Sequence, residues 1–135
     1  MKDVYNFLAE NAVQYLATID ENGFPKVRPF MMLAIDNGKF YFAVGSDKDV
    51  CKELKNNPNL ELAASSPTFE WLRISGKAAF VDDADLKRKL TKESEISESV
   101  YKNSKDSDFE IFYIAEPTVL ISIAGSKEPK VLKPY

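Results

Sequence analysis

Apolar and polar residues alternate along the chain in a pattern that predicts short strands interrupted by helices. Apolar residues recur at helical spacing over about residues 2 to 12, after an early acidic residue, which favours a first helix. Two Asn-Gly pairs, Asn22-Gly23 and Asn37-Gly38, then separate β-rich runs, and such pairs are typical of type I′ hairpin turns. We therefore expect a meander of three antiparallel strands, near residues 14 to 20, 25 to 35 and 39 to 44.

Two prolines mark the second of these runs. Pro25 and Pro29 each remove an amide donor, so this strand is expected at a sheet edge or at a bulge. The third run should be hydrogen-bonded beside the second. After it, a helix is expected over about residues 47 to 56, with Ser46 and Asp49 at the spacing of a capping box and Asp47 as an alternative cap.

The rest of the chain predicts more strands than helices. A strand is expected from LELAASS, and a long strand of period two from EWLRISGKAAFVDD, with Leu72 and Ile74 on one side. Gly76 in this strand indicates a bulge or a close backbone approach. A helix follows over Asp83 to Lys92 and a shorter one over residues 97 to 103. The serine-rich run 94–108 is expected to be the most mobile. Two last β-rich runs, FEIFYIAEP and TVLISIAGS, have Pro117 between them.

These elements predict an antiparallel barrel with peripheral helices, because β-α-β alternation is rare and a closed sheet hides its edges. The chain has 135 residues, 44% of them hydrophobic, which suits one domain over residues 1–135. We find no repeat and no linker. Acidic residues interrupt the first apolar run, so neither a signal peptide nor a membrane span is expected there, and a cytoplasmic protein is the default.

Charge and composition exclude several kinds of chemistry. A formal net charge of −3 gives no global positive field for nucleic acid. Histidine is absent, which excludes triads, histidine-ligated metals and an imidazole base. The single cysteine, Cys51, excludes an internal disulfide and is expected to be a buried small hydrophobe. Three possibilities remain: chemistry by a bound organic cofactor, chemistry by carboxylates, and no chemistry. The paired carboxylates of the sequence lie next to predicted turns and helix ends, where solvated charges are usual.

Two places in the sequence have residues suited to a ligand. The turn VGSDKD leads into a helix, whose first N–H groups attract anions, and Lys48 and Arg28 add positive charge. The same residues also fit an ordinary capped helix with solvated side chains. Trp71 and Arg73 share a strand face, where a planar heterocycle could stack, although Trp71 equally suits a subunit interface or the barrel rim.

The chain resembles the pyridoxamine 5′-phosphate oxidase-like split-barrel flavoproteins, in particular their short bacterial and archaeal branch. The likeness runs from about residue 2 to 92 and resumes at FEIFYIAEP; its ordered motifs are YLATID, GFPKVRPF, GKFYFAV, GSDKDVCKELKNNPNLEL and EWLRISGKAAFVDD. The resemblance implies a mainly β fold, a six-stranded antiparallel split β-barrel. It also implies a homodimer that binds flavin mononucleotide (FMN) at the subunit interface.

The resemblance assigns cofactor-binding residues one by one. Arg28 corresponds to the arginine that contacts the flavin phosphate, and Pro29, Phe30 and Met31 correspond to the backbone that lines the isoalloxazine ring. The turn around the phosphate and ribityl chain corresponds to Val44, Gly45, Ser46 and Lys48. Lys52 lies near a basic position of the family's helix. Trp71, with Arg73 beside it, stands where larger relatives have a flavin-contacting glutamine. No catalytic residue and no metal ligand is assigned.

The chain departs from the family pattern at two places. Val50 stands where larger oxidases have a lysine, so that role passes to Lys48 or Lys52; Lys48, nearer the first helical turn, is expected to contribute more. The C-terminal arginine and histidine segment of true pyridoxamine phosphate oxidases is missing. We therefore reject pyridoxamine phosphate oxidation, and the lack of histidine argues against the heme-degrading and nitroimidazole-reducing relatives that use one.

The function expected from these observations is that of an FMN-dependent oxidoreductase or flavin reductase with a small-molecule electron donor and acceptor. A flavin can supply the redox step in a chain without histidine. Three alternatives stay open: a non-catalytic flavin carrier or sensor, a split barrel that binds deazaflavin or heme, and an unliganded interaction module.

Overall fold

The computed structural model of the chain describes residues 2–93, 108–122 and 128–132. The helices are α1 (Lys2–Glu10), α2 (Asp49–Asn56) and α3 (Ala84–Glu93). The strands are β1 (Gln14–Ile19), β2 (Pro25–Phe30), β3 (Ala34–Asp36), β4 (Lys39–Gly45), β5 (Asn59–Ser65), β6 (Trp71–Val81), β7 (Phe109–Ser122) and β8 (Lys130–Leu132). The expected helix at residues 97 to 103, and the polar run 94–108 except Asp108, lie outside the described residues.

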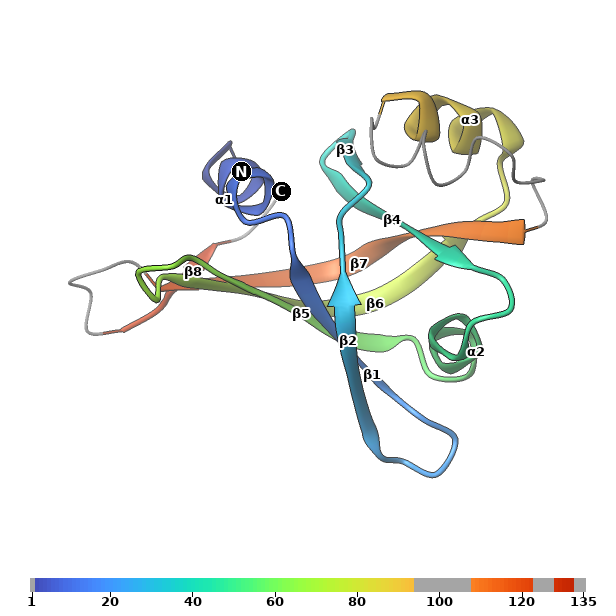
Figure 1. Cartoon of the computed structure of the whole chain (residues 1–135), viewed down its shortest axis with the longest axis horizontal. Helices are drawn as coiled ribbons and strands as arrows, with labels where there is room; N and C mark the ends of the chain where they lie inside the picture. The colour runs from blue at the N-terminus through green and yellow to red at the C-terminus, as the bar shows by residue number, and fades with distance from the viewer. Residues whose placement is uncertain (1, 94–107, 123–127, 133–135) are drawn as a thin grey trace.

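The expectation of a mainly β, antiparallel split barrel is confirmed, with eight strands in place of six. The strand order is β2-β1-β5-β6-β7-β4-β3, and β8 pairs with β7. Figure 1 shows the β1–β2 hairpin projecting from one side of the sheet, with α2 beside it and α1 and α3 on the opposite side. Among the described residues no helix is long and apolar enough to cross a membrane.

The predicted meander is interrupted between its two hairpins, β1–β2 and β3–β4. β2 pairs with β1 and lies at an edge of the sheet, as its prolines indicated, but β4 pairs with β7 and not with β2. The run 25–35 is broken at residues 31–33, where the chain crosses from one part of the sheet to the other. There the Met32 amide donates to the buried Gln14 side chain at 2.8 Å, and the Leu33 amide donates to the Tyr41 carbonyl at 2.8 Å.

The two Asn-Gly pairs form different turns. Asn37 and Gly38 both have positive φ, 49° and 74°, which confirms the type I′ turn between β3 and β4. At the first pair, Gly23 has a φ of 83° but Asn22 does not have positive φ. The Asp20 carboxylate accepts hydrogen bonds from the amides of Asn22 and Phe24, both at 2.9 Å. This side-chain cap produces a longer loop than the predicted two-residue turn.

β6 and β7 form the longest ladder, and both carry irregularities at the same level. The register shifts between Ser75 and Lys77, so the bulge expected at Gly76 is confirmed. A Cβ at Gly76 would lie 2.5 Å from the Ile114 side chain and 2.7 Å from the Ala115 carbonyl oxygen. Opposite, Glu116 has a φ of 52°, and β7 continues through Pro117 as one strand where two were expected.

Aromatic side chains fill the interior of the barrel. Phe42 and Phe112 stack with ring centroids 5.5 Å apart, and Phe30 lies 5.9 Å from Phe42. Leu72 and Ile74 of β6 are buried in the same cluster, as the alternation in that strand predicted. Burial of this apolar area is the main stabilising contribution to the fold.

α2 packs through one apolar face, formed by Val50, Cys51 and Leu54. The helix begins at Asp49, two residues later than predicted, and Lys48 is its N-cap. The expected capping by Ser46 or Asp47 is wrong, since the N-cap makes no side-chain hydrogen bond. At the other end, the Asn57 amide donates to the Glu53 carbonyl at 2.7 Å.

Candidate functional site

The Arg28 side chain lies between the β1–β2 hairpin and α2. Its Nη2 donates to the Glu53 carboxylate (Oε1) at 2.6 Å, and its Nη1 donates to the Thr18 hydroxyl at 2.6 Å and to the Leu16 carbonyl at 3.4 Å. The Thr18 hydroxyl in turn donates to the same Glu53 oxygen at 2.7 Å. The side chains of Arg28 and Glu53 are 23% and 13% exposed. This network fastens α2 to the hairpin.

The sequence led us to expect Arg28 at the N-terminus of α2, through pairing of the second and third strands. Because β2 pairs with β1 instead, Arg28 reaches α2 at Glu53, in the second turn of the helix. Sequence reasoning missed both side-chain partners of Arg28. The separations in the chain, 25 residues to Glu53 and 10 to Thr18, left no local spacing that could have identified them.

The turn before α2 packs tightly around Gly45. A Cβ there would lie 3.0 Å from Cγ of Lys48 and 3.3 Å from the Asp47 carboxylate, so the lysine stem covers the glycine. The Ser46 amide donates to the Asp108 carbonyl at 3.0 Å, and the Lys48 amide donates to the Gly45 carbonyl at 3.1 Å. Val44 is buried, so only its backbone faces the turn.

A hollow of about 540 Å³ lies between the hairpin loop and α2. Four carboxylate and two lysine side chains are among its lining residues, so its charge is predominantly acidic. The lining residues are Asp20, Glu21, Asn22, Lys26, Asp49, Lys52, Glu53 and Asn56.

A second set of candidate residues forms a row on the outer face of the sheet. Residues opposite each other in a ladder share a face. Pro29 is opposite Tyr15, Tyr15 is opposite Ala63, and Ala63 is opposite Arg73, so the row crosses four strands. The Arg73 guanidinium stacks on the Trp71 ring at 4.6 Å and lies 3.9 Å from the Glu61 carboxylate.

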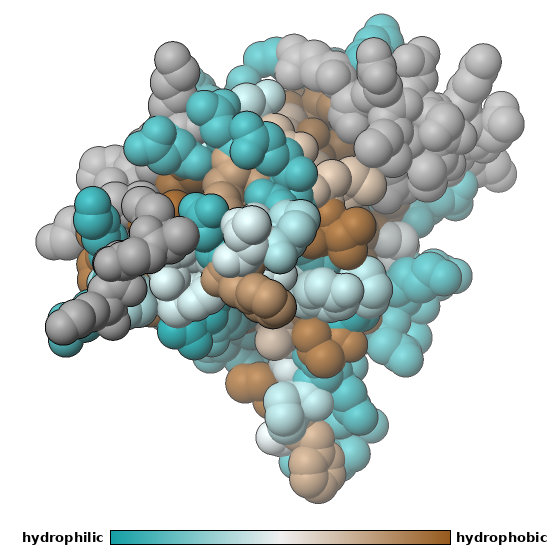
Figure 2. Space-filling model, turned by 60° about the vertical axis from the view of Figure 1, so that its left-hand side comes forward, coloured by the Kyte–Doolittle hydropathy of each residue, from teal (hydrophilic) through white to brown (hydrophobic). Residues whose placement is uncertain are grey.

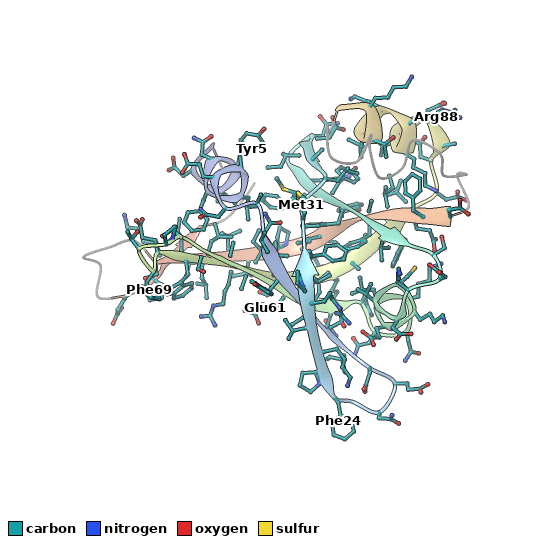
Figure 3. The ribbon with its side chains drawn as sticks, in the orientation of Figure 1. Tyr5, Phe24, Met31, Glu61, Phe69 and Arg88 are labelled. Atoms are coloured by element: carbon teal, nitrogen blue, oxygen red, sulfur yellow. The ribbon has the colours of Figure 1, made fainter. Side chains whose placement is uncertain are left out.

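The outer face around β2 is apolar and accessible. Tyr15 is 50% exposed, Val27 68% and Met31 39%. Figure 2 shows brown, hydrophobic side chains among hydrophilic ones on the projecting hairpin at the bottom of the molecule. Phe24 and Met31 flank β2 at its two ends (Figure 3). Phe30, by contrast, turns into the aromatic core, so only its backbone can line a ligand on this face.

The two sets of candidates lie on opposite faces of the sheet. Arg28 is opposite Leu16, Leu16 is opposite Leu62, and Leu62 is opposite Ile74, all three of which are buried. Arg28 therefore belongs to the inner face, while Arg73 belongs to the outer one. The structure thus brings Arg28 to α2 and Pro29 to the row of Arg73, but does not bring Arg28 and Arg73 together within one copy of the chain.

Cys51 is part of a polar cluster that sequence reasoning missed. Its thiol donates to the Glu110 carboxylate at 3.3 Å, and Lys55 Nζ lies 2.6 Å from the same oxygen. Burial, helped by the hydrogen bond to Glu110, raises the pKa of the thiol to about 11. The hydrogen bond from Lys55 lowers the pKa of Glu110. Cys51 is buried as predicted, and at neutral pH its thiol is protonated and unreactive.

The chain is similar to known proteins in sequence and in structure. Residues 1–119 match the model of a family described as pyridoxamine 5′-phosphate oxidase. A sequence comparison with curated proteins found no match. Among the described residues, no group of three or more carboxylate, thiol or imidazole side chains is placed to hold a metal ion.

Several solved structures share the fold. A NimC/NimA family protein from Clostridium acetobutylicum is 29% identical, with a TM-score of 0.80 over 98% of this chain and 92% of its own. A heme-binding protein from Mycobacterium smegmatis is 17% identical, with a TM-score of 0.75 over 95% and 55%. The heme storage protein HutZ from Vibrio cholerae is 18% identical, with a TM-score of 0.73 over 89% and 92%.

Proposed function

The chain belongs to the pyridoxamine 5′-phosphate oxidase family, and on that premise we propose that it binds FMN between two copies of itself and uses it for electron transfer. The observation that carries the proposal is the extent of the family match. Residues 1–119 include every candidate residue from Arg28 to Arg73. The proposal treats the chain as one flavin-binding unit.

The division of candidates between two sheet faces supports a homodimer. Arg28 and α2 lie on the inner side, while Pro29, Trp71 and Arg73 lie on the outer face. A single ligand can contact both sets when a second copy places its outer face against the hairpin and α2 of the first. The exposed apolar side chains of Tyr15 and Val27 give such a contact a hydrophobic component.

The outer face suits the isoalloxazine ring. Its apolar side chains offer a surface for a flat heterocycle, and the stacked Trp71 and Arg73 offer an aromatic plane and guanidinium donors. The backbone from Pro29 to Met31 forms the end of β2: Pro29 and Phe30 are the last residues of its ladder with β1, and Met31 follows the strand. These residues would hold and orient the ring.

The turn before α2 suits a phosphate in part. Lys48 and Lys52 contribute positive charge, and an α-helix N-terminus attracts anions. Arg28, however, already binds Glu53, so it does not offer a whole guanidinium. The hydrogen bonds among the described residues use three of its five N–H donors, two on Nη1 and one on Nη2. The donor on Nε and the second donor on Nη2 are left for a ligand.

Bound FMN would supply hydride and electron transfer, which the side chains of this chain do not supply. The role of the protein is then to bind the flavin, to orient it and to exclude water from one face of the ring. A chain without histidine and with a protonated, buried cysteine suits an oxidoreductase whose redox step belongs to the cofactor.

Two alternatives share the same binding site. A flavin carrier or sensor would bind FMN without turnover. A heme or deazaflavin protein would use the outer face for a different planar cofactor, and the heme-binding proteins with this fold make heme worth testing. We favour flavin over heme because the chain has no histidine for an axial ligand.

The test is a titration of the purified protein with FMN, with heme as a parallel arm. We expect FMN fluorescence to be quenched, and light scattering to give a dimer. Addition of reduced nicotinamide should bleach the flavin spectrum if the protein is an enzyme, and leave it unchanged if it is a carrier. Saturable heme binding without FMN binding, or FMN bound to a monomer, would contradict the proposal.

A further inference from the structure

The Glu53 carboxylate binds the guanidinium of Arg28, the residue that the family pattern assigns to a flavin phosphate. This carboxylate accepts from Arg28 at 2.6 Å and from Thr18 at 2.7 Å, and it is the more buried member of the ion pair. The anion that Arg28 binds is thus an internal one. A phosphate at hydrogen-bond distance from Arg28 would lie close to this carboxylate as well.

The other charged side chains of the hollow beside the Arg28–Glu53 pair are predominantly negative. This hollow contains the carboxylates of Asp20, Glu21 and Asp49, against the lysines Lys26 and Lys52. A dianionic phosphate that approaches from this side therefore meets more negative than positive charge. Like charges a few ångströms apart repel, and partial burial strengthens that repulsion.

A phosphate has two ways to bind near Arg28, and both reduce its contribution. It can leave the ion pair intact, in which case it meets a neutralised arginine. Alternatively, it can displace Glu53, which leaves a largely buried carboxylate without its cation and also breaks the contact that holds α2 to the hairpin. Neither route gives the full strength of an arginine-phosphate pair.

We propose that Glu53 is a specificity-determining residue, which makes this site select the neutral ring and ribityl part of a flavin and draw little affinity from its phosphate. The inference rests on the proposed flavin-binding function. It follows that riboflavin, which has no phosphate, binds about as well as FMN. In this proposal the flavin ring and ribityl chain provide most of the binding free energy, and the phosphate adds little.

The experiment compares FMN and riboflavin by fluorescence titration against three proteins: the unaltered chain, Glu53→Gln and Glu21→Gln. Glutamine at position 53 removes the charge and keeps a hydrogen-bond acceptor for Thr18 and Arg28. Glu21→Gln removes one negative charge from the same hollow without touching Arg28, and so controls for the general electrostatic effect. Circular dichroism checks that each variant is folded.

We expect the unaltered chain to bind the two flavins within about threefold of each other, and Glu53→Gln to favour FMN by about tenfold or more, the lower range for a hydrogen bond to a charged group. Glu21→Gln should change this ratio by less than about threefold, as expected for an exposed charge. The inference is overturned if the unaltered chain already prefers FMN by more than about tenfold. That measurement needs no variant, so it decides even if Glu53→Gln does not fold.

The same titration separates failure of this inference from failure of the proposed function. If both flavins bind and Glu53→Gln leaves their ratio unchanged, flavin binding stands and the Arg28–Glu53 pair only joins α2 to the hairpin. If neither flavin binds to the folded, unaltered chain, the proposed function fails and the inference fails with it.

Discussion

Arg28 and Glu53 form a hydrogen-bonded ion pair of 2.6 Å that joins the edge strand of the sheet to the second turn of α2. The pair is largely shielded from water, because the two side chains are 23% and 13% exposed. It therefore differs from the exposed ion pairs of the chain, whose net contribution to stability is small. An arginine selected from sequence for ligand binding thus has a structural partner of its own.

Arg28→Ala should destabilise the fold as well as alter ligand binding. The substitution leaves the largely buried Glu53 carboxylate without its cation, so we expect a loss of roughly 2 kcal/mol in the free energy of unfolding. Lys26→Ala is the control, because Lys26 is exposed and lies 3.8 Å from Asp20; its loss should stay below about 0.5 kcal/mol. Urea unfolding measures both, and equal small losses would contradict the prediction.

Lys48→Ala should weaken FMN binding more than Lys52→Ala. Lys48 precedes the first turn of α2, whereas Lys52 lies in the hollow whose carboxylates offset its charge. We expect a loss of roughly two- to fivefold for Lys48, with riboflavin binding unchanged, because a solvated charge contributes little and is screened by salt. Titrations at low and high salt measure this, and a larger effect at Lys52 would reverse the assignment.

Stability should fall at alkaline pH as Cys51 ionises. Burial holds the pKa of the folded thiol at about 11, above its ordinary value of 9.0, so the unfolded chain loses this proton first. The stabilising contribution is complete below about pH 9 and is lost as the pH rises to about 11, by at most about 1.4 kcal/mol per pH unit.

Cys51→Ser isolates this effect, because serine can still donate to Glu110 but does not titrate in this range. The pH dependence of the unaltered chain minus that of Cys51→Ser gives the contribution of the thiol, and cancels that of Tyr41, whose pKa is also raised by burial. Parallel curves between pH 8 and 11 would show that the thiol is not shielded as the structure indicates.

Gly76→Ala should be poorly tolerated. The added methyl group would lie 2.7 Å from the Ala115 carbonyl oxygen, which belongs to the backbone and cannot rotate away, so we expect a loss of about 3 kcal/mol. Gly23→Ala has open space and only the penalty of positive φ, about 1 kcal/mol. Thermal unfolding of both variants ranks them, and a larger loss at Gly23 would contradict the close approach at the bulge.

Val27→Asp should prevent formation of the proposed dimer, since it places a charge in the middle of the exposed apolar surface of β2. Phe69→Asp is the matched control, because Phe69 is a more exposed hydrophobic residue in the turn before β6, at another end of the molecule (Figure 3). Light scattering should give a monomer for the first variant and a dimer for the second. A dimer in both cases would place the interface elsewhere.

Local signals in the sequence predicted local structure well. Alternation in β6, the bulge at Gly76, the turn at Asn37-Gly38 and the edge position of β2 depend on neighbouring residues, and all are confirmed. The turn at Asn22-Gly23 was predicted wrongly because the Asp20 carboxylate caps the loop. Hydrogen bonds from the loop amides to this preceding side chain stabilise a longer loop in place of the two-residue type I′ turn.

Pairing between distant strands could not be predicted in the same way. The choice of β7 over β2 as partner of β4 depends on the crossing at residues 31–33, where a buried glutamine replaces a strand neighbour. The candidate site was affected for the same reason. Residue types suited to a flavin were evident, but their distribution over two sheet faces, and the partner Glu53, follow from strand order and register.

The prolines of β2 also have a consequence for the behaviour of the chain before it is fully folded. The ladder between β2 and β1 is unbroken although Pro25 and Pro29 have no amide N–H. The amide donors missing at these two positions are therefore ones that would point away from the sheet. An exposed edge strand with intact amide donors can pair with strands of other molecules and so promote aggregation. A fold with many pairings between sequence-distant strands forms slowly, so its edges stay exposed for longer. Replacing both prolines should therefore leave the native fold nearly unchanged and make refolding at high protein concentration more prone to precipitation.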